Sequence, residues 1–148
     1  MQGASDTDGP LQTMLHASCV AVQGRAALII GASGRGKSGL ALQLMAYGAD
    51  LVSDDRTEVA LHASRLVARA PQHIRGMIEA RGVGILNAKP VDAADVRLVV
   101  DLDRKENDRL PHPREIVLLG QSVPLLWHAE GTHFAAAILQ FLRHGRTA

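Results

Sequence analysis

The chain has 148 residues, about the length of one domain, and a formal charge of only +1 at pH 7. Hydrophobic residues make up 47% and charged residues 21% of it, and the arginines are scattered rather than grouped. These values are typical of a globular enzyme and exclude a low-complexity scaffold, and we expect no nucleic-acid partner. The single cysteine, Cys19, excludes an internal disulfide and a paired-cysteine zinc site, and we interpret it as a small buried hydrophobe.

The amino-terminal segment predicts neither export nor membrane insertion. Residues 1–12 are polar and acidic and lack the basic and apolar parts of a secretory signal. We expect them to be a flexible tail ahead of a single domain over residues 13–148. Apolar stretches farther along are shorter than the roughly 20 residues that cross a bilayer. The sequence therefore favours a cytoplasmic protein without a membrane partner.

A hairpin is predicted to lead into a glycine-rich loop. Apolar and β-branched residues at 15–22 and 26–30 flank a turn at 23–25, and the loop follows at 31–38. Apolar residues then recur at the spacing of one helix face: Leu40, Ala41, Leu44 and Met45. Gly48 is placed to end this helix.

The rest of the chain predicts more strands than helices. Strands are expected at 49–52, 57–61, 65–68, 96–102, 116–119 and 123–127. Residues 71–84 carry proline, glycines and charges, which predicts a loop with at most a short helix. A last helix is expected at 132–144, capped by Thr132, with one apolar face that packs on the sheet. Because several neighbouring strands look like hairpins, we predict an α/β fold with a mixed sheet.

The loop matches the phosphate-binding pattern G-x-x-x-x-G-K-[ST]. It consists of Gly31, Ala32, Ser33, Gly34, Arg35, Gly36, Lys37 and Ser38. The glycines let backbone N–H groups turn inward, where they neutralise a polyphosphate together with the Lys37 ammonium and a Mg²⁺ ion held by the Ser38 hydroxyl. A glycine-rich turn with a chance lysine is the alternative, but the strand before and the helix after favour a site for ATP and Mg²⁺.

Acidic residues near the loop supply candidates for catalysis. Asp54 and Asp55 end the next apolar run, where one carboxylate can hold the metal and the other can accept a proton from an attacking hydroxyl. The sequence does not separate their roles, and a solvated acidic turn is the alternative. Farther on, Glu79 and Arg81 lie among glycines in an apolar stretch, which indicates either an exposed pair or a part of the same site.

Five segments resemble, in order, the catalytic domain of the HPr kinase/phosphorylase family. They are 15–18, 31–38, 51–55, 79–87 and 107–110. Glu-x-Arg-Gly-x-Gly-Ile and the Asp-Asp pair are more specific to that family than the loop is. Its members phosphorylate a serine of HPr, the phosphocarrier of the bacterial phosphotransferase system, and many reverse the reaction. The resemblance implies an ATP-dependent serine kinase acting on HPr or an HPr-like carrier, in a form with the catalytic domain alone.

The resemblance also implies roles for single residues. Lys37 would contact the β- and γ-phosphates and Arg81 the nucleotide. The metal ligands would come from Ser38, Asp55 and Glu79.

For the transfer itself, the resemblance implies that Asp54 or Asp55 is the base. His16 would lie near the transferring phosphoryl group, although without the family it reads as a surface histidine. Arg109 would stabilise the phosphoryl charge or the carrier's phosphoserine.

At the level of the fold, the resemblance implies a phosphoenolpyruvate-carboxykinase-like P-loop domain and a homo-oligomer, a hexamer in most members. Residues 127–133 replace an arginine-rich segment of the bifunctional members, so we expect phosphorylation more than dephosphorylation. Two other functions remain open: a small-molecule kinase using the same loop, and a module that senses ATP without transferring phosphate.

Overall fold

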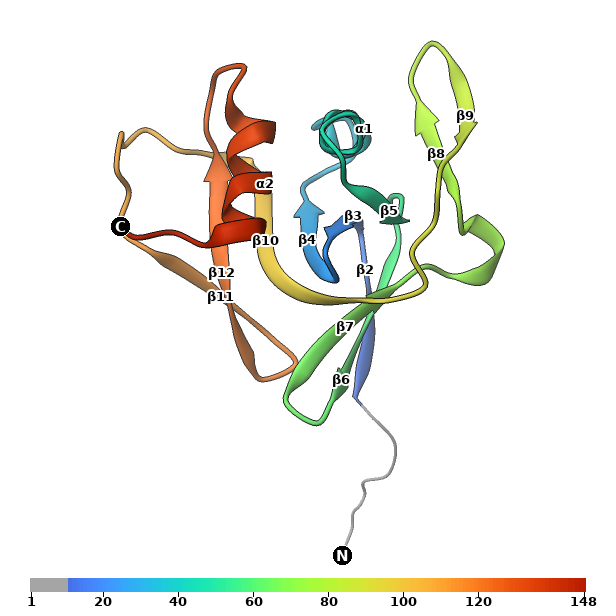
Figure 1. Ribbon diagram of the computed structural model, residues 1–148, viewed down its shortest axis with the longest axis horizontal. Coiled ribbons are helices and arrows are strands. Elements are labelled where there is room, and N and C mark those ends of the chain that lie inside the picture. The colour runs from blue at the N-terminus through green and yellow to red at the C-terminus, as the bar shows by residue number, and fades with distance from the viewer. Residues whose placement is uncertain (1–10) are drawn as a thin grey trace, which may run out of the picture.

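The computed structural model describes residues 11–148, which form a curled sheet, a separate hairpin and two helices (Figure 1). In chain order the elements are β2 (Gln12–Leu15), β3 (Ala17–Val22), β4 (Arg25–Ile30), α1 (Lys37–Ala46), β5 (Asp50–Ser53), β6 (Thr57–His62), β7 (Arg65–Arg69), the 3₁₀ turn η1 (Gln72–Ile74), β8 (Met77–Ala80), β9 (Gly84–Asn87), β10 (Ala94–Lys105), β11 (Arg114–Leu118), β12 (Gln121–His128) and α2 (Phe134–His144). The predicted tail lies almost entirely outside the described residues, but Gln12 already belongs to β2.

The large sheet is mixed, as predicted. Its strand order is β2-β6-β7-β10-β4-β3-β5, with β12 joined to β10 and β11 joined to β12. The long strand β10 runs parallel to β4 and β12 but antiparallel to β7. Its start pairs with β7 and its end with β12, so these two strands share one edge of β10 while β4 holds the other. Figure 1 shows β10 sweeping in a curve between the two halves of the sheet.

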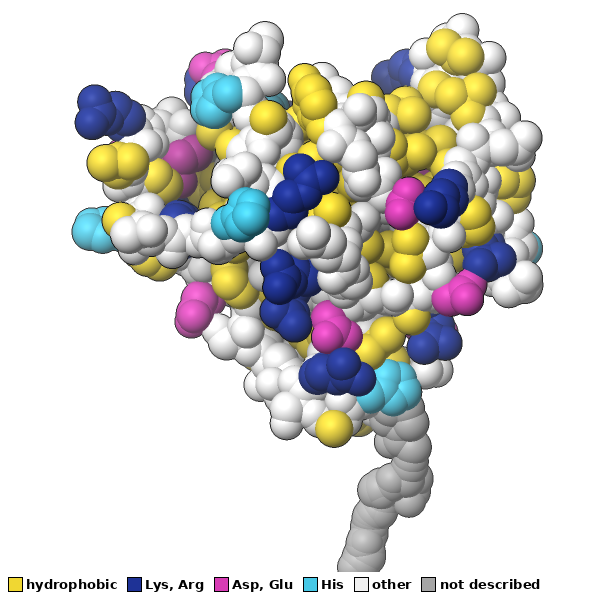
Figure 2. Space-filling view, viewed as in Figure 1, with side chains coloured by type: hydrophobic (Ala, Val, Ile, Leu, Met, Phe, Trp, Pro, Cys, Tyr) yellow, Lys and Arg dark blue, Asp and Glu magenta, His cyan; other side chains and the backbone are white. Residues whose placement is uncertain are grey.

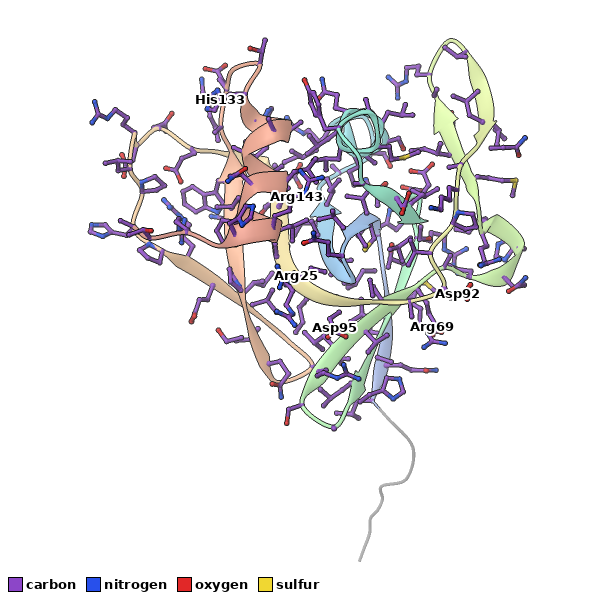
Figure 3. The ribbon with its side chains drawn as sticks, in the orientation of Figure 1. Arg25, Arg69, Asp92, Asp95, His133 and Arg143 are labelled. Carbon is purple, nitrogen blue, oxygen red and sulfur yellow. The ribbon has the colours of Figure 1, made fainter. Side chains whose placement is uncertain are left out.

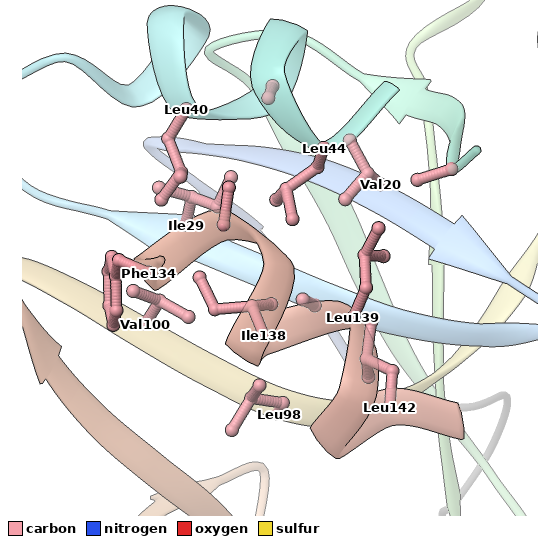
Figure 4. Close-up of a cluster of buried hydrophobic side chains, with 14 of the residues drawn as sticks. Val20, Ile29, Leu40, Leu44, Leu98, Val100, Phe134, Ile138, Leu139 and Leu142 are labelled. Carbon is pink, nitrogen blue, oxygen red and sulfur yellow. The ribbon is translucent and has the colours of Figure 1, made fainter. Parts of the chain in front are cut away.

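Two hydrophobic clusters lie on opposite faces of the sheet. Neighbouring residues of β4 divide between them, Ile29 in the first cluster and Leu28 in the second, because side chains alternate along a strand. In the first cluster, helices α1 and α2 cover the sheet (Figure 4). Its members include Val20, Leu40, Leu44, Leu98, Val100, Phe134, Ile138, Leu139 and Leu142. The apolar face of α2 therefore packs on the domain's own sheet, as expected.

The second cluster contains Cys19, packed among apolar residues of the other face. Burial raises the pKa of its thiol well above the ordinary value, so the group stays protonated and inert. The interpretation of Cys19 as a buried hydrophobe is confirmed.

Three local expectations differ from the structure. Residues 71–84 contain more than a loop, because β8 pairs with β9 in a separate two-stranded sheet. Alternate residues of β8 are buried, which is the pattern of a strand. The neighbouring glycines predicted a loop there, so the strand was not recognised in the sequence. The strand expected at 15–22 is divided at His16 into β2 and β3. Thr132 does not cap α2, whose cap residue is His133 without a side-chain hydrogen bond.

Neither helix among residues 11–148 is long and apolar enough to span a bilayer.

Truncating the core at α2 should destabilise the fold strongly. Ile138 is fully buried against the sheet and α1, so Ile138→Ala is expected to lower the free energy of unfolding by about 2–5 kcal/mol through lost burial and a cavity. Urea denaturation measures the change. Val117→Ala is the control, because Val117 is exposed on β11, and it should cost less than about 1 kcal/mol. Equal losses in the two variants would contradict the assigned core.

Candidate active site

The glycine-rich loop joins the end of β4 to the start of α1. Gly36 precedes the helix in a left-handed conformation, with φ of 95°, and no side chain caps the helix. The first N–H groups of α1 and the positive end of its dipole are thus available to an anion. At Gly31, where φ is 149°, a Cβ atom would lie 3.3 Å from the Cβ of Leu102, so a larger residue would be strained and would require β10 to shift by a few tenths of an ångström.

Lys37 lies within this loop rather than in solvent. Its side chain is only 5% exposed, and its ammonium donates a hydrogen bond of 2.7 Å to the carbonyl of Gly31. The same ammonium lies 3.8 Å from a carboxylate oxygen of Asp55. The loop therefore holds a fixed positive charge beside the acidic pair.

Asp54 is the centre of a hydrogen-bonded cluster. Its Oδ1 accepts bonds from the hydroxyls of Ser38, at 2.6 Å, and Ser18, at 2.9 Å. Its Oδ2 accepts a bond of 3.0 Å from the backbone N–H of Glu79. The hydroxyl of Ser18 in turn accepts a bond from the N–H of Asp55. A hydroxyl and a carboxylate in contact offer oxygen ligands suited to Mg²⁺. This ion binds proteins through a few oxygen atoms and keeps several of its waters.

Asp55 points in another direction. Its backbone is left-handed, with φ of 65°, an uncommon conformation that aspartate tolerates better than most residues. Its carboxylate lies between Lys37 and His16, 3.9 Å from Nδ1 of the imidazole, and is 55% exposed. The two aspartates thus face different partners: Asp54 the Ser38 hydroxyl, and Asp55 the lysine and open solvent.

Other predicted site residues do not join this cluster through their side chains. Glu79 reaches it only through its N–H group, and its carboxylate is exposed. Arg81, in the turn between β8 and β9, and Arg109, in the segment between β10 and β11, are exposed and form no hydrogen bond or ion pair within residues 11–148. Over the same residues, no group of three or more His, Cys, Asp or Glu side chains is placed to hold a metal ion.

Two residues of the site were absent from the sequence-based candidates. One is Ser18, and the other is Asp103, whose carboxylate accepts a bond of 3.1 Å from the N–H of Ala32 in the loop. Asp103 also lies 3.2 Å from Nε of Arg35. The sequence did contain a signal for Asp103, since it follows the clearest later apolar run, 96–102. Ser18 lies in the segment 15–18 that resembles the family, but the sequence assigned it no role.

Removing the Ser18 hydroxyl should loosen the acidic pair. The side chain is fully buried and bonds to both Asp54 and Asp55, so Ser18→Ala leaves the N–H of Asp55 and a carboxylate oxygen of Asp54 without this partner. We expect a loss of about 1–3 kcal/mol in the free energy of unfolding, measured by thermal or urea denaturation. Ser122→Ala, at an exposed position of β12, should stay within about 0.5 kcal/mol of the parent. A neutral Ser18→Ala variant would contradict the cluster.

Comparison with known proteins identifies the family. The sequence profile of the HPr serine kinase C-terminal domain matches residues 10–114. The HPr kinase/phosphorylase of Caldicellulosiruptor bescii is 39% identical over 124 residues, which cover 75% of this chain and 40% of that protein. The HPr kinase/phosphorylase of Azoarcus sp. (strain BH72) is 37% identical over 124 residues, with coverage of 74% and 40%. The chain therefore spans about 40% of the length of these curated relatives.

A solved structure has the same fold. The Hpr(Ser) kinase/phosphatase from Coxiella burnetii superposes with a TM-score of 0.75 at 23% identity, over 88% of each chain. This likeness confirms the predicted P-loop α/β fold with a mixed sheet. The sequence profile and the curated relatives confirm the resemblance drawn from the five segments, and the chain belongs to the family of the HPr serine kinase C-terminal domain.

Proposed function

We propose that the chain is an ATP-dependent kinase that phosphorylates a serine of HPr or of an HPr-like phosphocarrier. One observation carries this proposal: the loop lysine, Lys37, lies beside two aspartates at one end of β4, and these aspartates face different partners. Family membership supports the carrier as the substrate class, since the curated relatives are named HPr kinase/phosphorylase.

The phosphate loop supplies the nucleotide site in this proposal. Lys37 would contact the β- and γ-phosphates of ATP, giving up its bond to the Gly31 carbonyl as it turns to the ligand. The free N–H groups at the start of α1 add donors for the same phosphates. Most of the rate enhancement would then come from positioning and charge neutralisation, as in other phosphoryl-transfer sites.

Ser38 and Asp54 are the residues that would hold Mg²⁺. Their oxygen atoms already lie in contact, whereas Asp55 and Glu79, the other expected ligands, direct their carboxylates elsewhere or into solvent. When bound, the metal supplies positive charge to the phosphate oxygens as the leaving group departs. Ser18 and the N–H of Glu79 hold the Asp54 carboxylate in place for this task.

Asp55 is the base in this proposal. The serine oxygen of the carrier attacks the γ-phosphorus, the bond from phosphorus to the ADP oxygen breaks, and the serine proton passes to the Asp55 carboxylate. Its exposure leaves it open to a protein hydroxyl, and the nearby Lys37 and His16 orient it. Arg109 and Arg81, both exposed, would contact the phosphorylated carrier and the nucleotide when those are bound.

A feature beside the site favours a protein substrate over a metabolite. The hairpin of β8 and β9 contacts the site through the N–H of Glu79 and rises away from the large sheet (Figure 1). Its apolar residues Val83 and Ile85 are 75% and 71% exposed. Apolar side chains exposed together on the rim of a site are typical of a surface that contacts another protein.

A transfer assay tests the function. The protein is incubated with Mg²⁺, γ-labelled ATP and HPr, and the label is mapped as acid-stable phosphoserine. We expect label on one serine of HPr and none on HPr in which that serine is replaced by alanine. Tight ATP binding without transfer would contradict the proposal and favour an ATP-sensing module or a small-molecule kinase.

A further inference from the structure

A second concentration of charge lies at the end of β4 that is remote from the phosphate loop. A cavity of about 760 Å³ opens there beside the first residue of β4, and its charged lining consists of Arg25, His62, Arg65, Arg69, Asp95 and Arg97. Its volume falls within the roughly 300–1,000 Å³ of typical small-molecule sites. None of these residues takes part in the phosphate-loop site described above.

The cavity arises from the way the sheet divides. One edge of β10 pairs with β7 at Ala94 and Asp95 and with β12 only from Val99 onward. Between these points no strand is paired to that edge, and Arg97 lies in the interval. The turn before β4 adds Gly24 to the lining. Separate strands thus bring together arginines that are far apart in the sequence.

Positive charge in the cavity exceeds negative charge. Asp95 is the only carboxylate of the lining. Its Oδ2 already forms ion pairs with two arginines, Arg65 at 3.3 Å and Arg97 at 3.7 Å. The Arg69 side chain forms no ion pair or hydrogen bond within the described part of the chain. Figure 2 shows Lys and Arg side chains gathered on this face, and Figure 3 places Arg25, Arg69 and Asp95 along the region where β7 and β10 cross.

Arg25, one of the lining residues, is held in place by hydrogen bonds to the end of α2. Its Nη1 donates to the carbonyls of Leu142 and Arg143 at the end of α2, at 3.1 and 2.9 Å. Those two bonds leave the Nε and Nη2 hydrogens of the same guanidinium available to another acceptor. The helix end therefore holds one cation of the lining in place before any ligand arrives.

We propose that this cavity binds a small multivalent anion that carries phosphate groups. The basic lining is made of arginines and one histidine, without lysine, and the planar guanidinium group matches phosphate oxygens with paired hydrogen bonds. The site is independent of the nucleotide site, because the six residues of β4 hold the two apart by about 20 Å. One domain then carries two anion sites, at opposite ends of one strand.

An NMR titration with inorganic pyrophosphate tests the proposal. The ¹⁵N-labelled chain is titrated in EDTA, and the amides of Gly24 and Ala94 report on the cavity while those of Gly34 and Gly36 report on the loop. We expect saturable shifts in both groups, with separate affinities. The double variant Arg69→Gln/Arg97→Gln should weaken binding at the cavity by roughly 100-fold, about tenfold for each guanidinium, with no change at the loop.

A matched control removes the same charge elsewhere. Arg104→Gln/Lys105→Gln lies at the far end of β10, outside the lining, and should leave cavity binding within about twofold. Shifts confined to the loop would overturn the proposal, as would equal weakening in the two double variants, which would indicate a general effect of charge. Cavity shifts with anionic phospholipid vesicles but not with pyrophosphate would also overturn it, and would indicate a membrane surface as the partner.

Discussion

Replacing Lys37 by alanine is expected to lower phosphoryl transfer to the carrier by about 10³-fold or more. The ammonium is the one nearly buried positive charge of the loop, 5% exposed, and it would neutralise the γ-phosphate as charge develops there. The turnover number, measured with labelled ATP and HPr, should fall much more than the free energy of unfolding. The cost to stability should stay near 1 kcal/mol, because the losses are the bond to the Gly31 carbonyl and a 3.8 Å ion pair with the half-exposed Asp55, which solvent screens.

Lys89→Ala is the control for the loss of a lysine. Lys89 is exposed in the segment that follows β9, so its variant should keep the parent's turnover within about twofold. A Lys37→Ala protein that phosphorylates HPr at the parent's rate would show that the loop is not the catalytic phosphate site. A Lys37→Ala protein that is unfolded at room temperature would contradict the small stability cost.

Asp55→Asn and Asp54→Asn are expected to fail in different ways. An amide cannot accept the serine proton, so Asp55→Asn should lower turnover by about 10²–10⁴-fold while ATP affinity stays within about twofold. Asp54 accepts hydrogen bonds at both of its oxygens, including one from the Ser38 hydroxyl, whereas an asparagine side chain at this position would offer a single acceptor oxygen. Asp54→Asn should therefore raise the Mg²⁺ concentration needed for half-maximal activity.

Measuring turnover at varied ATP concentration and at varied Mg²⁺ concentration distinguishes the defects of the two variants. The reverse pattern, with the metal effect in Asp55→Asn, would exchange the roles proposed here. Unchanged transfer in both variants would show that neither carboxylate acts in the reaction. Lost transfer with retained ATP binding in Asp55→Asn would argue against a module that only senses ATP, since such a module needs no base.

Local features of the sequence were enough to predict the framework of the domain. The strand at 26–30, observed as β4, the loop and helix α1 were predicted in order, because a phosphate loop needs glycines, a lysine and a helix at fixed positions along the chain. The apolar face of α2 was readable from helical spacing alone. The hairpin of β8 and β9 was missed, because its short alternating strands lie between glycines that predict turns.

The sequence placed Asp54 and Asp55 in the site but could not tell them apart. Their different directions depend on β3 and β5, whose antiparallel pairing sets Cys19 opposite Ser53 and so brings Ser18 beside the acidic pair. In the same way, the parallel pairing of β10 with β4 sets Asp101 opposite Ile30 and brings Asp103 beside Ala32.

The sequence by itself thus determined the family, the glycine-rich loop motif and the elements of the core, because each depends on residues close together in the chain. The tertiary structure alone decided which aspartate faces Ser38, which residues support it, and that four scattered arginines line one cavity. The physical reason is that strand order and register join residues tens of positions apart, and no local pattern in one sequence specifies those pairings.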